Sequence, residues 1–124
     1  MKRFLGGLVL MGWVMAWVSP LLAESGGRLV VFTTDFCPYC KEFMDNVAPA
    51  YPKTDLGKRF PMTMVDNFSP PKEWEEMAWQ IRFYPTFLVV DGHGKARGQF
   101  RGYRGEEFFW SELEGIASRI PDSR

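Results

Sequence analysis

The two cysteines of the chain, Cys37 and Cys40, lie close together in the stretch TTDFCPYCK at positions 33–41. Thiols at this spacing could bind a metal, tether a haem, form a structural disulfide or act as a redox pair. Haem attachment needs a histidine directly after the second cysteine, and that residue is Lys41. Structural zinc needs four ligands, and the single histidine, His93, is far away in the sequence. We therefore expect no metal or haem cofactor at this site.

A disulfide between Cys37 and Cys40 would stabilise the fold weakly, because the stabilisation grows with the length of the closed loop. A redox pair has a clearer physical basis. Pro38 is typical of the first residue of a helix, so Cys37 is expected at a helix N-terminus. The free backbone N–H groups and the helix dipole there favour an anion, which lowers the pKa of a thiol. Cys40 follows one turn later, where we expect it to be more buried and less ionised.

These positions predict a role for each cysteine. Cys37 attacks a disulfide on a partner protein and forms a mixed disulfide, and Cys40 then attacks Cys37 and releases the reduced partner. The reverse sequence would oxidise the partner, so an oxidant or isomerase is an alternative. A second alternative is a non-catalytic binding module that uses the dithiol or an aromatic patch to hold a metal or a protein.

The elements that must position the dithiol alternate between strands and helices. Hydrophobic patterning and turn residues predict them in this order: a strand at 28–34, a helix beginning at Pro38, a polar loop with a short turn at 51–60, a strand at 60–66, a helix at 73–83, a strand at 86–90, a glycine-rich hairpin turn at 91–95, a strand at 96–103 and a helix at 105–120. Successive β-α-β units predict parallel strands, and the hairpin adds an antiparallel edge. The expected fold is α/β, with a mixed central sheet flanked by helices on both faces.

The last predicted helix carries a buried stripe of four residues, namely Phe109, Leu113, Ile116 and Ile120. The consecutive aromatic residues at 108–110 cannot all lie on one helix face. We interpret them as packing against the sheet, with a partner-docking patch as the alternative.

A second motif, YPTF at 84–87, opens a predicted buried strand. A proline that follows an aromatic residue often has a cis peptide bond, which here would turn the groups of Tyr84 toward the dithiol. An ordinary proline at the start of a strand fits Pro85 equally well.

CPYCK at a strand-to-helix turn, YPTF at the start of a later strand and a closing helix together resemble the thioredoxin superfamily over residues 28–120. The resemblance implies a cis peptide bond before Pro85 and a backbone at Tyr84 that pairs with an incoming peptide. It implies the following site: catalytic Cys37 and Cys40, and substrate-binding Pro38, Tyr39, Tyr84, Pro85 and Thr86. Two features depart from the superfamily pattern. Val31 occupies the position of the buried acid of thioredoxins, and the separated glycines Gly102 and Gly105 replace the paired glycines of the glutathione site in glutaredoxins.

The stretches CPYCKEF, APAYPKTDLGKR, YPTFLVVDGHG and FRGYRGEEFFW are similar to the periplasmic thioredoxin-like proteins of bacterial sulfur-oxidation (Sox) operons. This narrower resemblance implies a reductase that keeps the cysteine of a sulfur-carrier protein in working form. It also implies a membrane thiol–disulfide electron carrier that reduces the protein again.

The N-terminal segment has the order of a secretory signal, with two basic residues, an apolar stretch and a small residue at Ala23. We predict a signal peptide at 1–23 and a thioredoxin-like domain at 24–124. The alternative is a retained anchor, because the uncharged stretch 4–23 is about long enough to cross a bilayer. Either arrangement places the domain outside the cytoplasm. The chain has a formal net charge of zero and no basic run, so we expect no nucleic-acid partner.

Overall fold

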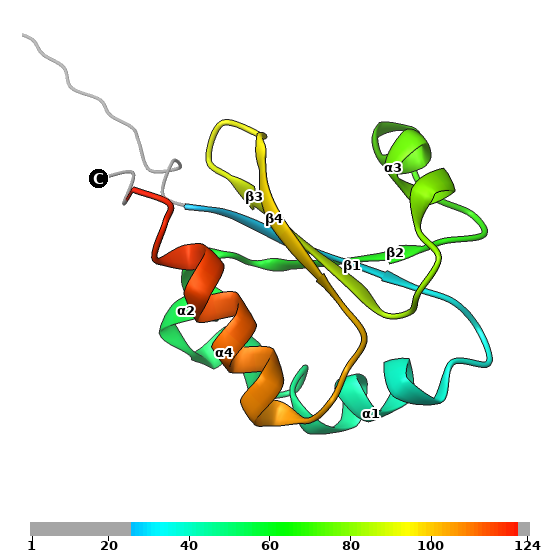
Figure 1. Cartoon of the computed structure of the whole chain (residues 1–124), viewed down its shortest axis with the longest axis horizontal. Helices are drawn as coiled ribbons and strands as arrows, with labels where there is room; N and C mark the ends of the chain where they lie inside the picture. The colour runs from blue at the N-terminus through cyan, green and yellow to red at the C-terminus, as the bar shows by residue number, and fades with distance from the viewer. Residues whose placement is uncertain (1–25, 122–124) are drawn as a thin grey trace, which may run out of the picture.

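The computed structural model describes residues 26–121, which form one four-stranded sheet with helices on both faces (Figure 1). The strands are β1 (Gly27–Thr33), β2 (Met62–Asp66), β3 (Thr86–Asp91) and β4 (Ala96–Arg101), and the helices are α1 (Pro38–Asn46), α2 (Asp55–Arg59), α3 (Glu75–Gln80) and α4 (Glu106–Ala117), with single 3-10 turns η2 (Tyr51–Lys53) and η3 (Lys72–Trp74). The predicted signal peptide or anchor at 1–23 lies outside the described residues. Within 26–121, no helix has the length and apolar character needed to span a membrane.

The sheet has the strand order β2-β1-β3-β4, and only β1 and β2 run parallel. Strand β3 runs antiparallel to both β1 and β4. The mixed sheet is therefore confirmed, but the prediction of a parallel β-α-β unit around α3 was wrong. The last residue of β2, Asp66, pairs with Thr33 of β1, and the first residue of β3, Thr86, pairs with its neighbour Phe32. The chain therefore enters β3 from the end of the sheet at which it left β2.

Side chains of β1 alternate between the two faces of the sheet and so contribute to two hydrophobic cores. Leu29 and Val31 belong to the larger core, which α1 and α4 cover. Val30 and Phe32 belong to the smaller core on the opposite face, beneath α3 (Figure 1). All four side chains are fully buried, as expected for a central strand with helices on both sides.

The larger core is dominated by aromatic rings around Phe109 of α4. Its ring centroid lies 5.2 Å from those of Phe43 and Phe87 and 5.0 Å from that of Trp110. The four residues of the predicted stripe are all buried, but α4 ends at Ala117, so Ile120 packs against the core from the turn that follows the helix. Phe108 and Trp110 are half-buried and pack against this same core, which confirms the packing interpretation of residues 108–110.

The segment 51–60 was predicted as a polar loop with a short turn; the turn is present as η2, but the rest was wrong, because residues 55–59 form the helix α2. The Thr54 hydroxyl caps α2 by accepting the Gly57 N–H at 2.9 Å. The Tyr51 ring is fully buried, and its hydroxyl donates to the carbonyl oxygen of Phe60 at 2.7 Å. Burial also raises the pKa of the Tyr51 phenol. Such short helical turns carry too few residues for a hydrophobic period to reveal them.

Candidate active site

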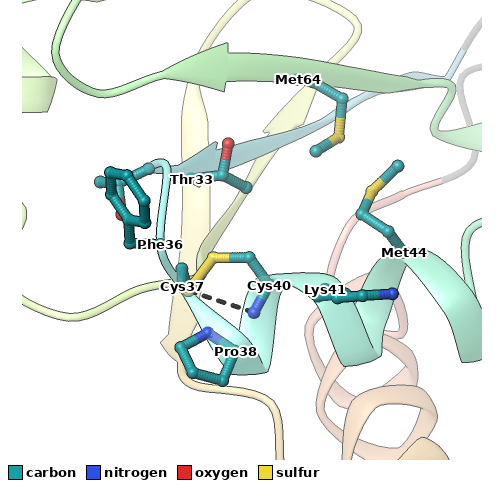
Figure 2. Close-up of a pocket in the computed structure, with 9 residues that line it drawn as sticks. Thr33, Phe36, Cys37, Pro38, Cys40, Lys41, Met44 and Met64 are labelled. Carbon is teal, nitrogen blue, oxygen red and sulfur yellow. Dashed lines mark hydrogen bonds between the residues drawn. A yellow bond between two sulfur atoms is a disulfide. The ribbon is translucent and has the colours of Figure 1, made fainter.

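The dithiol lies where the chain leaves β1 and enters α1. Cys37 is the N-cap of α1 and Pro38 is its first residue, which confirms the predicted helix start. Cys37 and Cys40 form a disulfide, and the Cys40 backbone N–H donates to Cys37 Sγ at 3.1 Å (Figure 2). The N-terminus of α1 therefore offers a backbone N–H group to the sulfur of Cys37.

The two sulfur-bearing residues differ in accessibility. Cys37 is half-buried, whereas Cys40 is only 5% exposed. This confirms the predicted difference in burial. Phe36, directly before Cys37, has a φ of 59° in the left-handed region that non-glycine residues rarely adopt, and its side chain is fully exposed. An incoming disulfide can therefore approach Cys37 but not Cys40.

The second motif is brought near the dithiol, because Tyr84 lines the same hollow as Tyr39, which lies between the two cysteines. The Tyr84–Pro85 bond is cis, as the resemblance implied, and Pro85 is buried. Thr86 is 1% exposed, and its hydroxyl donates to the carbonyl oxygen of Phe83 at 2.6 Å. Asn67 Nδ2 lies 2.7 Å from the Tyr84 hydroxyl and so positions the ring. The buried Thr86 therefore stabilises the loop at 83–85 through its hydrogen bond, whereas Tyr84 is partly exposed to solvent.

Two hollows flank the dithiol, and each is formed by several segments. The first, of about 610 Å³, is mainly apolar, and Met44 of α1 and Met64 of β2 point toward one another across it (Figure 2). Its lining consists of Thr33, Thr34, Phe36, Cys37, Pro38, Cys40, Lys41, Met44 and Met64. The second hollow, of about 380 Å³, is here called the arginine groove. Its lining consists of Tyr39, Phe83, Tyr84, Arg101, Gly102 and Arg104.

The arginine groove brings together predicted site residues from both motifs. Tyr39 lies between the cysteines and Tyr84 precedes the cis proline, and both line this groove. Sequence reasoning missed its other side chains. Phe83 could have been found because it is the neighbour of Tyr84, whereas Arg101 and Arg104 carry no local signal.

Other residues near the motifs make contacts unrelated to the sulfurs. Lys41 Nζ pairs with Asp45 at 2.9 Å in an exposed i,i+4 ion pair. His93 is exposed in the hairpin turn. Val31, at the position of the thioredoxin acid, is fully buried in the larger core. Within residues 26–121, no group of three or more His, Cys, Asp or Glu side chains is placed to hold a metal ion.

The fold and the Cys37–Cys40 pair define a thiol–disulfide oxidoreductase with a thioredoxin fold. Comparison with protein families matches residues 22–117 to the thioredoxin-like domain, so the chain belongs to this family. Comparison with curated proteins finds no match.

Solved structures give the same assignment. The chain is similar to the reduced form of the periplasmic thioredoxin SoxS from Paracoccus pantotrophus, with 29% identity, a TM-score of 0.65 and coverage of 76% of this chain and 98% of that one. A thioredoxin-fold protein from Helicobacter pylori shares 23% identity, with a TM-score of 0.61 and coverage of 77% and 71%. A thioredoxin from Thermus thermophilus shares 24% identity, with a TM-score of 0.58 and coverage of 73% and 72%. The last two likenesses concern the fold alone.

Proposed function

We propose that the protein is a periplasmic reductase that keeps a cysteine of a partner protein reduced. The observation that carries this proposal is the arrangement of the two cysteines at the start of α1. Cys37 caps the helix and is partly accessible, whereas Cys40 lies behind it and is buried. One sulfur can therefore meet a partner while the other is kept for the second step.

The proposed reaction has two exchange steps. The Cys37 thiolate attacks one sulfur of the partner disulfide, a mixed disulfide forms and the other partner sulfur leaves as a thiolate. The Cys40 thiolate then attacks Cys37, the mixed disulfide breaks and the second partner sulfur leaves. Two electrons pass to the partner, whose disulfide becomes two thiols, while Cys37 and Cys40 become the disulfide present in the structure. The N-terminus of α1 favours the reactive thiolate of Cys37.

The substrate site extends from the dithiol to the cis proline. In this proposal, Pro38 and Tyr39 contact the partner beside Cys37, and Tyr84 pairs its backbone with the partner chain. The N–H and C=O groups of Tyr84 make no hydrogen bond within residues 26–121, so both are free for this pairing. Pro85 and Thr86 are buried and hold the Tyr84 backbone in place.

The proposed location rests on the similar structure from Paracoccus pantotrophus, which is named a periplasmic thioredoxin SoxS. The predicted signal at 1–23 supports the same compartment. The proposed direction of electron flow rests on the sequence resemblance to the thioredoxin-like proteins of sulfur-oxidation operons. By the same sequence resemblance we propose a sulfur-oxidation carrier protein as the partner and a membrane thiol–disulfide carrier as the source of electrons.

Trapping the mixed disulfide tests the proposal. A Cys40→Ser variant should accumulate a covalent adduct between Cys37 and its partner, which dithiothreitol releases for identification. The Cys37→Ser/Cys40→Ser double variant is the matched control and should trap nothing. The absence of any adduct with a periplasmic protein would contradict the reductase. A Cys37–Cys40 pair that stays oxidised in growing cells, whether or not the membrane supplies electrons, would indicate the oxidant or isomerase instead.

A further inference from the structure

Asn67, the residue that follows β2, connects three segments around the active site. Its backbone N–H donates to the carbonyl oxygen of Thr33 at 2.8 Å, at the end of the strand that leads to the dithiol. Its side-chain amide donates to the carbonyl oxygen of Ala78 in α3 at 3.1 Å and to the hydroxyl of Tyr84 at 2.7 Å. One residue therefore joins the strand before the dithiol to the residue before the cis proline, although neither motif contains it.

The hydrogen bonds of Asn67 hold the tip of the Tyr84 ring. The amide group has two N–H donors, and the carbonyl of Ala78 and the hydroxyl of Tyr84 use both. The Tyr84 hydroxyl also lies 3.4 Å from the carbonyl oxygen of Ile81, to which it donates its own hydrogen. The ring itself packs against the smaller core. The side chain of Tyr84 is therefore fixed both along the ring and at its end.

The backbone around Tyr84 is held as well, apart from two groups. The carbonyl oxygen of Pro85 accepts the Gly102 N–H at 2.7 Å, and that of Phe83 accepts the Thr86 hydroxyl at 2.6 Å. The N–H and C=O groups of Tyr84 make no hydrogen bond in the part of the chain that the structure describes. These two groups are the ones that the proposed function assigns to the partner chain.

Resting on the proposed function, we infer that Asn67 is a positioning residue for the partner chain and acts through Tyr84. By holding the ring, it keeps the two free backbone groups in one orientation, so less conformational entropy is lost when a peptide pairs with them. Within residues 26–121, no hydrogen bond joins Asn67 to either cysteine. Loss of its side chain therefore weakens the binding of a peptide and leaves the exchange of sulfur bonds unchanged.

Two disulfides separate the binding of a peptide backbone from the chemistry of the dithiol. One is a short uncharged peptide with alanines on both sides of its cysteine, and the other is 2-hydroxyethyl disulfide, which has no peptide groups. The purified protein, reduced beforehand, reacts with each in a single turnover that gives a second-order rate constant. In Asn67→Ala the constant for the peptide should fall roughly threefold, the cost of one side chain that must be ordered on binding. The constant for 2-hydroxyethyl disulfide should not change.

A second variant and a matched control assign the effect to the bond between Asn67 and Tyr84. Tyr84→Phe keeps the ring and removes the same bond, so it should show the same selective fall. The double variant Asn67→Ala/Tyr84→Phe should fall no further than either single variant, because both changes remove one interaction. Asn46→Ala is the control and should keep both constants. Asn46, the other asparagine of the chain, is exposed at the end of α1 and makes no side-chain hydrogen bond within residues 26–121.

A third substrate checks that the selective fall concerns backbone pairing. Methylation of the peptide nitrogens beside the cysteine removes the donors available to the Tyr84 carbonyl, so this peptide should react more slowly with the unaltered protein and equally with Asn67→Ala. Three results would overturn the inference and leave the oxidoreductase intact: an unchanged peptide constant in Asn67→Ala, an equal fall for both disulfides, or additive effects in the double variant. Failure of the unaltered protein to reduce any of these disulfides would remove the proposed function as well.

Discussion

The hydroxyl of Thr86 offers a sharp test of how the loop before β3 is held. Thr86→Val keeps the β-branched shape and removes only the hydrogen bond to the Phe83 carbonyl, which is 2.6 Å long. Because Thr86 is 1% exposed, water cannot replace this bond at the hydroxyl. A hydrogen bond contributes about 0.5–1.5 kcal/mol net, and an unpaired buried group costs roughly 1–3 kcal/mol. We therefore expect the free energy of unfolding to fall by about 1–2 kcal/mol.

Thermal and urea unfolding of the oxidised protein measure this loss. For a domain of this size, about 1 kcal/mol corresponds to a change in Tm of roughly 4–8 °C. Thr33→Val is the matched control, because the Thr33 hydroxyl makes the same kind of bond to the Val65 carbonyl at a weak 3.4 Å. Thr33→Val should change the stability by less than about 0.5 kcal/mol. Equal stabilities of the two valine variants would refute the argument that the Thr86 bond stabilises the loop.

Buried tyrosine hydroxyls and one depressed carboxyl pKa give two further predictions. Tyr103→Phe should not lower Tm, because its buried hydroxyl has no hydrogen-bond partner within residues 26–121. Tyr51→Phe should lower the free energy of unfolding by about 1 kcal/mol, because it loses the bond to the Phe60 carbonyl, and equal effects of the two variants in thermal unfolding would contradict this. The Lys95 backbone N–H, hydrogen-bonded to Asp91, holds the pKa of that carboxyl at about 2, below its ordinary 3.8. The stability that this ionised carboxyl adds is complete above about pH 4 and is lost as the pH falls toward 2. Asp91→Asn should therefore flatten the acid side of a plot of Tm against pH. An unchanged slope in the variant would contradict this prediction.

The features that the sequence predicted well are those that depend on neighbouring residues. Pro38 after Cys37 indicated the start of α1, and the structure has the helix start there. The spacing of Phe109 and Leu113 indicated the buried stripe of α4, and both are fully buried. In each case a few adjacent residues determine the local backbone, so the pattern is readable without knowledge of the fold. The roles of the two cysteines stay predictions, although their difference in burial agrees with them.

The features that the sequence missed depend on which segments meet. The direction of β3 is seen in its antiparallel pairing with β1, and no residue pattern in β3 itself reveals it. The short helix α2 is fixed partly by the Tyr51 hydroxyl, whose acceptor lies nine residues later. Propensities and hydrophobic periods cannot report such long-range contacts.

Some residues of the arginine groove can be predicted from the sequence and others cannot. Tyr39 is recognisable because it lies inside the cysteine motif, and Tyr84 because it precedes a proline at the start of a strand. Arg101 reaches the same place only because it pairs with Thr86 across β3 and β4. A shift of one residue in that register would turn Arg101 to the other face of the sheet. The set of side chains that line the groove therefore depends on the sheet register, whereas the chemistry of the dithiol depends on the start of one helix.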